Sequence, residues 1–98
     1  MIPAILIAIV CAAPAPDLDR LLDAIQAVET GGMADPDRAT GDQGRSIGAY
    51  QIQRGYWQDA QPYLPRVARG RPYQDCRDKA YAREIVKAYW RRYCRRAL

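Results

Sequence analysis

One segment decides how the rest of this 98-residue sequence is interpreted: Leu21-Leu22-Asp23-Ala24-Ile25-Gln26-Ala27-Val28-Glu29-Thr30-Gly31-Gly32. Its apolar residues continue a stripe at helical spacing, which consists of Leu18, Leu21, Leu22, Ile25 and Val28. The pattern predicts a helix that begins near Asp17, a suitable N-cap, and ends at the glycine pair. Glu29 is then expected in the last turn, at the edge of the buried face.

Glu29 is an unusual residue for that position. A carboxylate in the last turn faces the negative end of the helix dipole, and the apolar stripe beside it removes part of its water. Both effects favour the protonated form and raise the pKa, as a general acid at neutral pH requires. We therefore interpret Glu29 as a candidate general acid, the alternative being an exposed side chain that frays with the helix end.

A second carboxylate follows in a polar stretch. Residues 33–45 are rich in Asp, Gly and Pro, which predicts an irregular loop or a minimal hairpin after the first helix. Within them, Asp42 lies between glycines and is expected to stay solvated and ionised. Glu29 and Asp42 would supply the acid and the base or nucleophile that glycoside hydrolysis needs. Asp35 and Asp37 are competing candidates, and Asp residues in loops often serve only to form turns.

The rest of the chain predicts a mainly α fold. Ser46 could cap a short helix, residues 56–60 predict one or two further helical turns, and prolines and glycines make residues 61–74 a second loop. Asp75 or Asp78 is expected to cap a final helix rich in alanine, tyrosine and arginine. No run alternates convincingly between apolar and polar residues, so we expect little or no sheet.

Residues 1–16 carry no charge and are expected to be a signal peptide. The apolar run within them is too short to span a bilayer as a helix, although no basic residue precedes it. Residues 17–98 then form a single domain. A secreted, periplasmic or cell-envelope protein without a transmembrane span is expected.

Composition limits the chemistry further. Hydrophobic residues make up 49% of the chain and charged residues 27%, which is typical of a globular protein. The absence of His excludes His-based triads and disfavours zinc sites, so we expect no metal or cofactor. Only two Glu, Glu29 and Glu84, stand against nine Asp. If this protein is an acid–base catalyst, carboxylates must do the work.

Charge is distributed unevenly along the chain. Residues 1–65 carry four basic and eight acidic side chains, whereas residues 66–98 carry eleven basic and three acidic ones, consistent with the net charge of +4. A basic C-terminal half favours an anionic partner, for which an anionic cell envelope and nucleic acid are both candidates. The sequence has no zinc-finger spacing and no aromatic RNA-binding motif, so nucleic acid is not expected.

Two cysteines, Cys76 and Cys94, follow the expected signal peptide. The final helix would hold them on the order of 20–27 Å apart, well beyond the roughly 7 Å between Cα atoms that a disulfide tolerates. We therefore expect no bridge between them. Pairing between chains and burial as free thiols both remain open.

Three segments in order resemble the lysozyme-like superfamily. They are residues 24–32, the Gly-Asp-Gln-Gly loop at 41–44, and Ser46-Ile47-Gly48-Ala49-Tyr50-Gln51-Ile52. Goose-type lysozymes and lytic transglycosylases share this order. Invertebrate-type (destabilase) lysozymes and their bacterial relatives are the most similar, because they too have segments like Tyr56-Trp57-Gln58-Asp59 and Tyr89-Trp90-Arg91-Arg92-Tyr93.

This resemblance implies a small lysozyme-like helical domain that cuts peptidoglycan between N-acetylmuramic acid and N-acetylglucosamine. It implies that Glu29 is the general acid and Asp42 the nucleophile or charge stabiliser. It also implies that the segment beginning at Ser46 lines the sugar groove. The expected substrate-binding residues are Ser46, Gly48, Tyr50, Gln51 and Trp57.

The chemistry of these residues agrees with such roles. Ser46 could hydrogen-bond and orient an acid carboxyl, Gly48 permits close approach of backbone to substrate, and Gln51 can donate and accept. Tyr50 and Trp57 offer ring faces to sugars, although core packing is the alternative for both and is favoured for Trp57.

The sequence also departs from the invertebrate-type family. It lacks most of that family's cysteines, and it ends at Leu98 without the His-Asn-Gly-Gly-Pro segment that usually follows the last helix. Two alternatives therefore stand beside the lysozyme: a lytic transglycosylase that uses Glu29 alone, and a non-catalytic module that binds peptidoglycan or chitooligosaccharides. A small basic protein that binds nucleic acid or a protein partner through residues 66–98 is a third.

Overall fold

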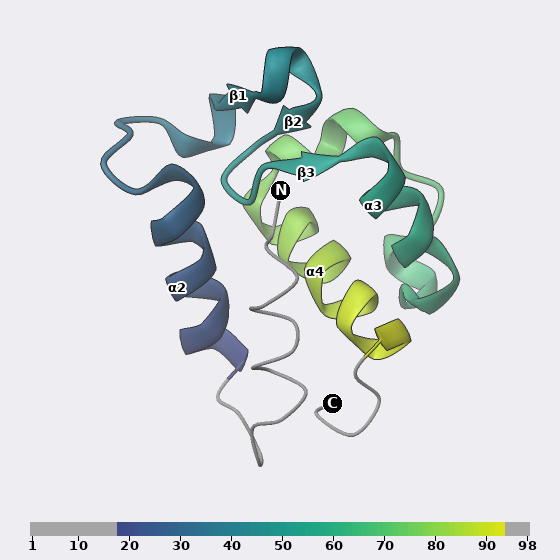
Figure 1. The fold of residues 1–98 in the computed structure, drawn as a ribbon. Coiled ribbons are helices and arrows are strands. Elements are labelled where there is room, and N and C mark those ends of the chain that lie inside the picture. Colours follow the sequence, from purple (N-terminus) through teal and green to yellow (C-terminus); the bar gives the residue numbers. More distant parts are fainter. Residues whose placement is uncertain (1–17, 94–98) are drawn as a thin grey trace.

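Helix α2 begins the described part of the chain, which comprises residues 18–93 of a computed structural model (Figure 1). It spans Leu18–Thr30 and ends directly before the glycine pair, as predicted. Leu22 and Ile25 are fully buried, but Val28 is 69% exposed, so its predicted place in the apolar stripe is wrong. The reason is rotation about the helix axis, since each residue turns the side chain by about 100°.

The buried face of α2 runs along one line through Leu18, Leu22, Ile25 and Glu29. These residues are separated by four, three and four positions, which stacks them along one side of a helix. Glu29 therefore continues the inward-facing line and is half-buried at its end, in agreement with the predicted place at the edge of the buried face, whereas Val28 is exposed. A carboxylate occupies a position where the helix would otherwise place an apolar side chain.

Three very short strands follow α2. They are β1 (Thr40–Gly41), β2 (Ser46–Ile47) and β3 (Ile52–Gln53), paired antiparallel in the order β1-β2-β3. Ser46 lies opposite Gly41 on one side and opposite Gln53 on the other. The expected hairpin is present, but the prediction that Ser46 caps a helix is wrong. Strands of two residues are too short to show alternation, so they could not be predicted from sequence pattern.

Two further helices form the opposite half of the fold. Helix α3 spans Arg54–Ala60, close to the predicted turns, and α4 spans Lys79–Tyr93. Asp78 caps α4, because its Oδ1 accepts the backbone N–H of Ala80 at 2.9 Å. Between α3 and α4, the predicted loop contains three 3₁₀ helices: Gln61–Tyr63, Arg66–Ala68 and Tyr73–Arg77. Another 3₁₀ helix, Pro36–Arg38, precedes β1.

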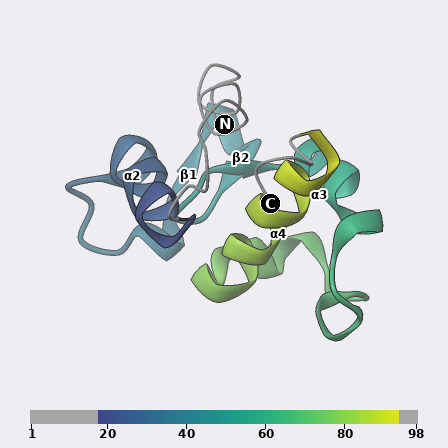
Figure 2. The same cartoon turned by 90° about the horizontal axis from the view of Figure 1, so that it is seen from below.

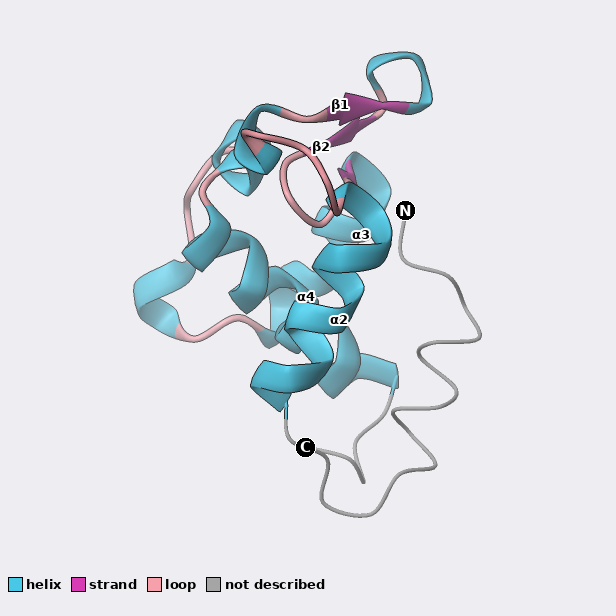
Figure 3. Cartoon of the chain, turned by 90° about the vertical axis from the view of Figure 1, so that its left-hand side faces the viewer, coloured by secondary structure: helices cyan, strands magenta, loops and turns pink. Residues whose placement is uncertain are grey.

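The core lies between α4 and the elements around it. Seen from below, α2 stands on one side and α3 with α4 on the other, with the strands crossing between them (Figure 2). Figure 3 shows the strands at one end of the helices. The core contains Trp90, Tyr81 and Ile85 of α4, each of which is at most 2% exposed. The fold is therefore mainly α, as the periodicity led us to expect, with a small three-stranded antiparallel sheet.

Polar side chains attach α2 to α4. The Arg83 guanidinium forms ion pairs with Asp19 and Asp23, with N–O distances of 2.8 and 3.1 Å. One turn earlier, Lys79 Nζ donates to Gln26 Oε1 at 3.1 Å. The two aspartates are largely exposed, so each pair stabilises the fold only modestly, but together they set the position of α2.

The cysteine and leader predictions have different outcomes. Cys76 is a fully buried free thiol. Its predicted separation from Cys94 is not tested, because Cys94 lies outside the described residues, as does the expected signal peptide at 1–16. None of the helices within residues 18–93 is both long enough and apolar enough to cross a bilayer.

Candidate active site

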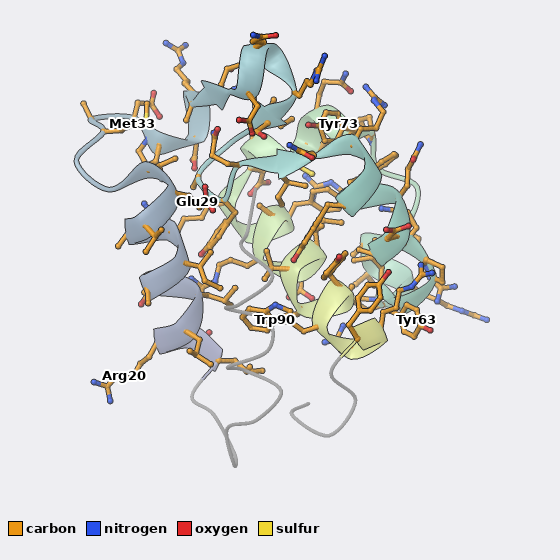
Figure 4. All side chains as sticks on the ribbon, viewed as in Figure 1. Arg20, Glu29, Met33, Tyr63, Tyr73 and Trp90 are labelled. Atoms are coloured by element: carbon orange, nitrogen blue, oxygen red, sulfur yellow. The ribbon has the colours of Figure 1, made fainter. Side chains whose placement is uncertain are left out.

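Glu29 lies at the end of α2 that faces the strands (Figure 4). Its side chain is half-buried on the inward-facing line of the helix. Burial raises the pKa of the Glu29 carboxyl above its ordinary value of 4.5, and the negative charge of Asp42 raises it further. A larger share of Glu29 is thus protonated near neutral pH than for an exposed glutamate.

Asp42 occupies the turn between β1 and β2 and is exposed. Its Oδ2 accepts a hydrogen bond of 2.6 Å from the Ser46 hydroxyl and a longer one of 3.4 Å from Gln53 Nε2. The bond from Ser46 and then that from Gln53 lower the pKa of the Asp42 carboxyl, because both stabilise its ionised form. Asp42 has a left-handed backbone, with φ of 52°, which aspartate tolerates better than most residues.

The two carboxyls are therefore shifted in opposite directions. Glu29 is displaced towards the protonated acid and Asp42 towards the ionised carboxylate. The charge of Asp42 is a minor contribution to the shift at Glu29, after burial. Such a pair can donate a proton on one side and stabilise developing positive charge on the other.

A buried hydrogen bond joins the end of α2 to the segment that follows β2. The Thr30 hydroxyl donates to the carbonyl oxygen of Ala49 at 2.8 Å, and the carbonyl of Gln26 lies at 3.3 Å as a second, more distant acceptor. Glu29 is adjacent to Thr30, so this bond holds the acid in place relative to the strands. Thr30 was not among the predicted site residues, although it directly follows the predicted acid.

Ser46 is fully buried and contacts Asp42. Ser46 was expected to orient the carboxyl of the acid, but the carboxyl that it contacts is that of Asp42, the expected nucleophile or charge stabiliser. Gln53 is a further residue that the sequence reasoning missed. Only the strand register shows that it lies opposite Ser46, so that both can reach the same carboxylate.

Gly48 makes a close approach to the protein's own backbone. Its φ is 80°, and a Cβ added there would lie 2.3 Å from the carbonyl oxygen of Cys76. Its N–H donates to the carbonyl of Ala39 at 2.9 Å. Glycine at this position thus allows the loop after β2 to pack against the segment before α4, whereas the sequence had suggested close approach to a substrate.

Tyr50 and Gln51 are turned inward. The Tyr50 ring is fully buried, and its hydroxyl accepts a 3.1 Å hydrogen bond from Arg83. Gln51 is 8% exposed and donates through Nε2 to the carbonyl of Gly48 at 3.0 Å. In this arrangement both side chains hold the loop after β2 together, and the ring faces of Tyr50 are covered by protein.

Trp57 takes the core position that was favoured for it. It packs partly buried against the core, and its indole N–H donates to the Tyr81 hydroxyl at 2.8 Å. Its ring meets that of Tyr73 edge to face, with centroids 5.8 Å apart. Trp57 therefore stabilises the junction of α3 and α4.

The competing aspartates have other surroundings. Asp35 pairs with the exposed Arg38, and the N–O distance is 3.6 Å. Asp37 has one buried carboxylate oxygen that has no hydrogen-bond partner within the described part of the chain. Of the three, Asp42 is the one whose carboxylate accepts hydrogen bonds from Ser46 and Gln53 of the strands that α2 faces (Figure 4). Asp42 is therefore the better candidate for the second carboxylate.

Comparisons of the chain with protein-family models, with curated proteins and with solved structures returned no match. The resemblance to the lysozyme-like superfamily accordingly rests on the residues quoted from the sequence and stays a prediction.

Proposed function

We propose that this chain is a lysozyme-like glycoside hydrolase that cuts peptidoglycan glycan strands between N-acetylmuramic acid and N-acetylglucosamine. One arrangement carries the proposal: Glu29 is half-buried in the last turn of α2, at the end that faces the strands (Figure 4), while Asp42 is exposed in the turn between β1 and β2 and accepts a 2.6 Å hydrogen bond from Ser46. These surroundings displace the pKa of Glu29 upward and that of Asp42 downward. Paired carboxyls of this kind perform glycoside hydrolysis in known enzymes. The ordered motifs around them, quoted above, support the same assignment.

In the proposed reaction, the Glu29 carboxyl gives its proton to the glycosidic oxygen as the bond from that oxygen to C1 breaks. The electron pair of that bond stays on the leaving oxygen, and the sugar that remains develops positive charge at C1. The Asp42 carboxylate stabilises or captures this charge. Water then adds to C1 and returns a proton to Glu29, which restores both carboxyls.

The proposal includes attraction to an anionic cell envelope through α4. The basic side chains of that helix are largely engaged within the domain: Lys79 with Gln26, Arg83 with two aspartates, Lys87 with Glu84, and Arg92 with Asp59. Attraction by α4 would therefore act through the overall field and weaken as salt rises. A secreted, periplasmic or envelope location belongs to the same proposal.

The experiment is a cell-wall clearing assay on the wild type, Glu29→Gln and Glu84→Gln. Loss of a general acid should reduce the rate by about 10²–10⁴-fold in Glu29→Gln. Glu84 is the matched control, because it is the second glutamate of the chain and its pair with Lys87 lies on α4. Full activity of Glu29→Gln would rule out the proposed mechanism.

A lytic transglycosylase that uses Glu29 alone is the second candidate. The observation that favours it is that the Asp42 carboxylate already accepts two hydrogen bonds from the protein. A carboxylate held in this way is less available to attack C1. In that scheme the sugar's own C6 hydroxyl attacks C1, and Glu29 first gives and then takes a proton. Mass spectrometry separates the schemes, since the internal attack yields an anhydro product that is lighter by one water. A binding module would bind glycan without turnover.

A further inference from the structure

A shallow pocket of about 380 Å³ lies next to Asp42. Gln53 belongs to both features, because it lines the pocket and its Nε2 donates to Asp42. The residues lining the pocket are Gly44, Arg45, Gln53, Arg54, Gly55 and Tyr73. A substrate that reaches Asp42 could therefore place one of its chemical groups in this pocket.

Tyr73 gives the pocket a rigid wall. Its ring is 7% exposed, and its hydroxyl donates to the carbonyl of Ile52 at 2.6 Å, with the carbonyl of Arg45 at 3.3 Å. The Arg54 guanidinium lies over this ring, 4.5 Å from its centroid. Stacking on a fixed aromatic ring restrains the arginine and leaves its N–H groups at the edge free to meet a ligand.

The charge of the pocket is positive. Neither Arg45 nor Arg54 forms an ion pair with any carboxylate among residues 18–93, in contrast to the arginines of α4 that pair with aspartates. Arg45 also acts on Asp42, where its charge helps to keep that carboxyl ionised, and it offsets the repulsion that Asp42 would exert on an anion. The Arg54 guanidinium at this pocket, with Arg45 as a second basic residue lining it, suits a planar carboxylate, which accepts paired N–H bonds.

We propose that this pocket binds a carboxylate that the glycan carries outside its sugar rings. The proposal rests on the proposed function and adds a substrate preference to it. Muramic acid has a lactyl group that ends in such a carboxylate, and in the intact wall this group is extended by an acidic peptide. Chitin has neither, so the pocket would make the protein favour muramyl glycans over chitin.

The test measures binding to Glu29→Gln protein by calorimetry, with three probes of equal sugar length. They are a chitooligosaccharide, a muramyl glycan stripped of peptide, and the same glycan carrying its peptide. Each is measured with and without Arg54→Gln, which removes one guanidinium, and with and without Gly55→Leu, which fills the pocket. A Cβ at Gly55 would meet no atom within 4 Å, and Gly55 has no positive φ, so this change is compatible with α3.

Both substitutions should reduce the preference for carboxylate-bearing glycans over chitooligosaccharide by about three- to tenfold. If only the stripped glycan is affected, the lactyl carboxylate is the ligand; if only the peptide-bearing glycan is affected, the peptide is. Arg20→Gln is the charge-matched control, since Arg20 lies at the opposite end of the domain from Tyr73 in Figure 4. It should leave the preference unchanged.

A preference that is unaffected by both Arg54→Gln and Gly55→Leu would overturn the pocket assignment. This failure differs from failure of the proposed function. In the first case the wild type still cuts glycan and Glu29→Gln does not, but the carboxylate preference is insensitive to the pocket. In the second case Glu29→Gln is as active as the wild type, or no glycan is cut at all.

Discussion

The hydroxyl of Thr30 donates a buried hydrogen bond of 2.8 Å to the carbonyl oxygen of Ala49, 19 residues further along the chain. This bond links the last turn of α2, which carries the candidate acid, to the loop between the strands β2 and β3. The position of Glu29 relative to the strands thus depends on a contact between the end of a helix and an irregular loop.

Replacing Thr30 by Val should therefore affect both stability and activity. The carbonyl of Ala49 would lose its buried donor, at a cost of about 1–3 kcal/mol in the free energy of unfolding. Urea denaturation measures that loss, and clearing activity should fall as Glu29 loses its fixed position. Thr30→Ser keeps the hydroxyl and should retain most of both, whereas equal losses in Thr30→Ser and Thr30→Val would contradict this role.

The pH dependence of activity should report the bond from Ser46 to Asp42. Ser46→Ala removes the hydrogen bond that contributes most to lowering the pKa of Asp42. The pKa of Asp42 then rises, so the acidic limb of the activity profile, where Asp42 becomes protonated, should move to higher pH. Gln53→Ala should move it in the same direction by less. An unchanged acidic limb in Ser46→Ala would show that Asp42 ionisation does not control the rate.

Glu29→Gln should stabilise the fold at neutral pH. Burial raises the pKa of Glu29 in the folded state above its ordinary value of 4.5, so ionisation of this group opposes folding. The penalty is complete above the folded pKa and vanishes below the unfolded one. The increase in melting temperature of Glu29→Gln over the wild type should accordingly be largest near pH 7 and disappear below about pH 4. A constant difference across this range would argue against a raised pKa.

Two glycines provide a matched pair for the packing of the site. Gly48→Ala should destabilise the fold by about 1–3 kcal/mol, because the residue has φ of 80° and its new Cβ would lie 2.3 Å from the carbonyl of Cys76. Gly55→Ala adds the same methyl group in open space within α3 and should stabilise by up to about 1 kcal/mol. Chemical denaturation of the two variants measures the difference, and equal effects would refute the close packing at Gly48.

Local sequence pattern was sufficient to predict those elements whose structure depends on residues close together in the sequence. The leucine spacing and the glycine pair predicted α2 as Leu18–Thr30, and Asp78 was one of two predicted caps of α4. The pattern failed at Ser46, because strands of two residues carry no periodicity and are defined only by their partners. It also failed at Val28, whose exposure depends on which side of α2 packs against the rest of the domain.

The sequence by itself determined the bounds of α2, the approximate places of α3 and α4, and which residues could supply acid–base chemistry. Helix periodicity, caps and the rarity of glutamate are local or compositional properties. Only the tertiary structure decided that Ser46 bonds Asp42 and that Tyr50 is covered by protein. It also brought Arg54 and Tyr73 together from distant parts of the chain. The reason is physical: burial, hydrogen-bond partners and pKa values depend on the packing between elements, which a periodic pattern along one element does not contain.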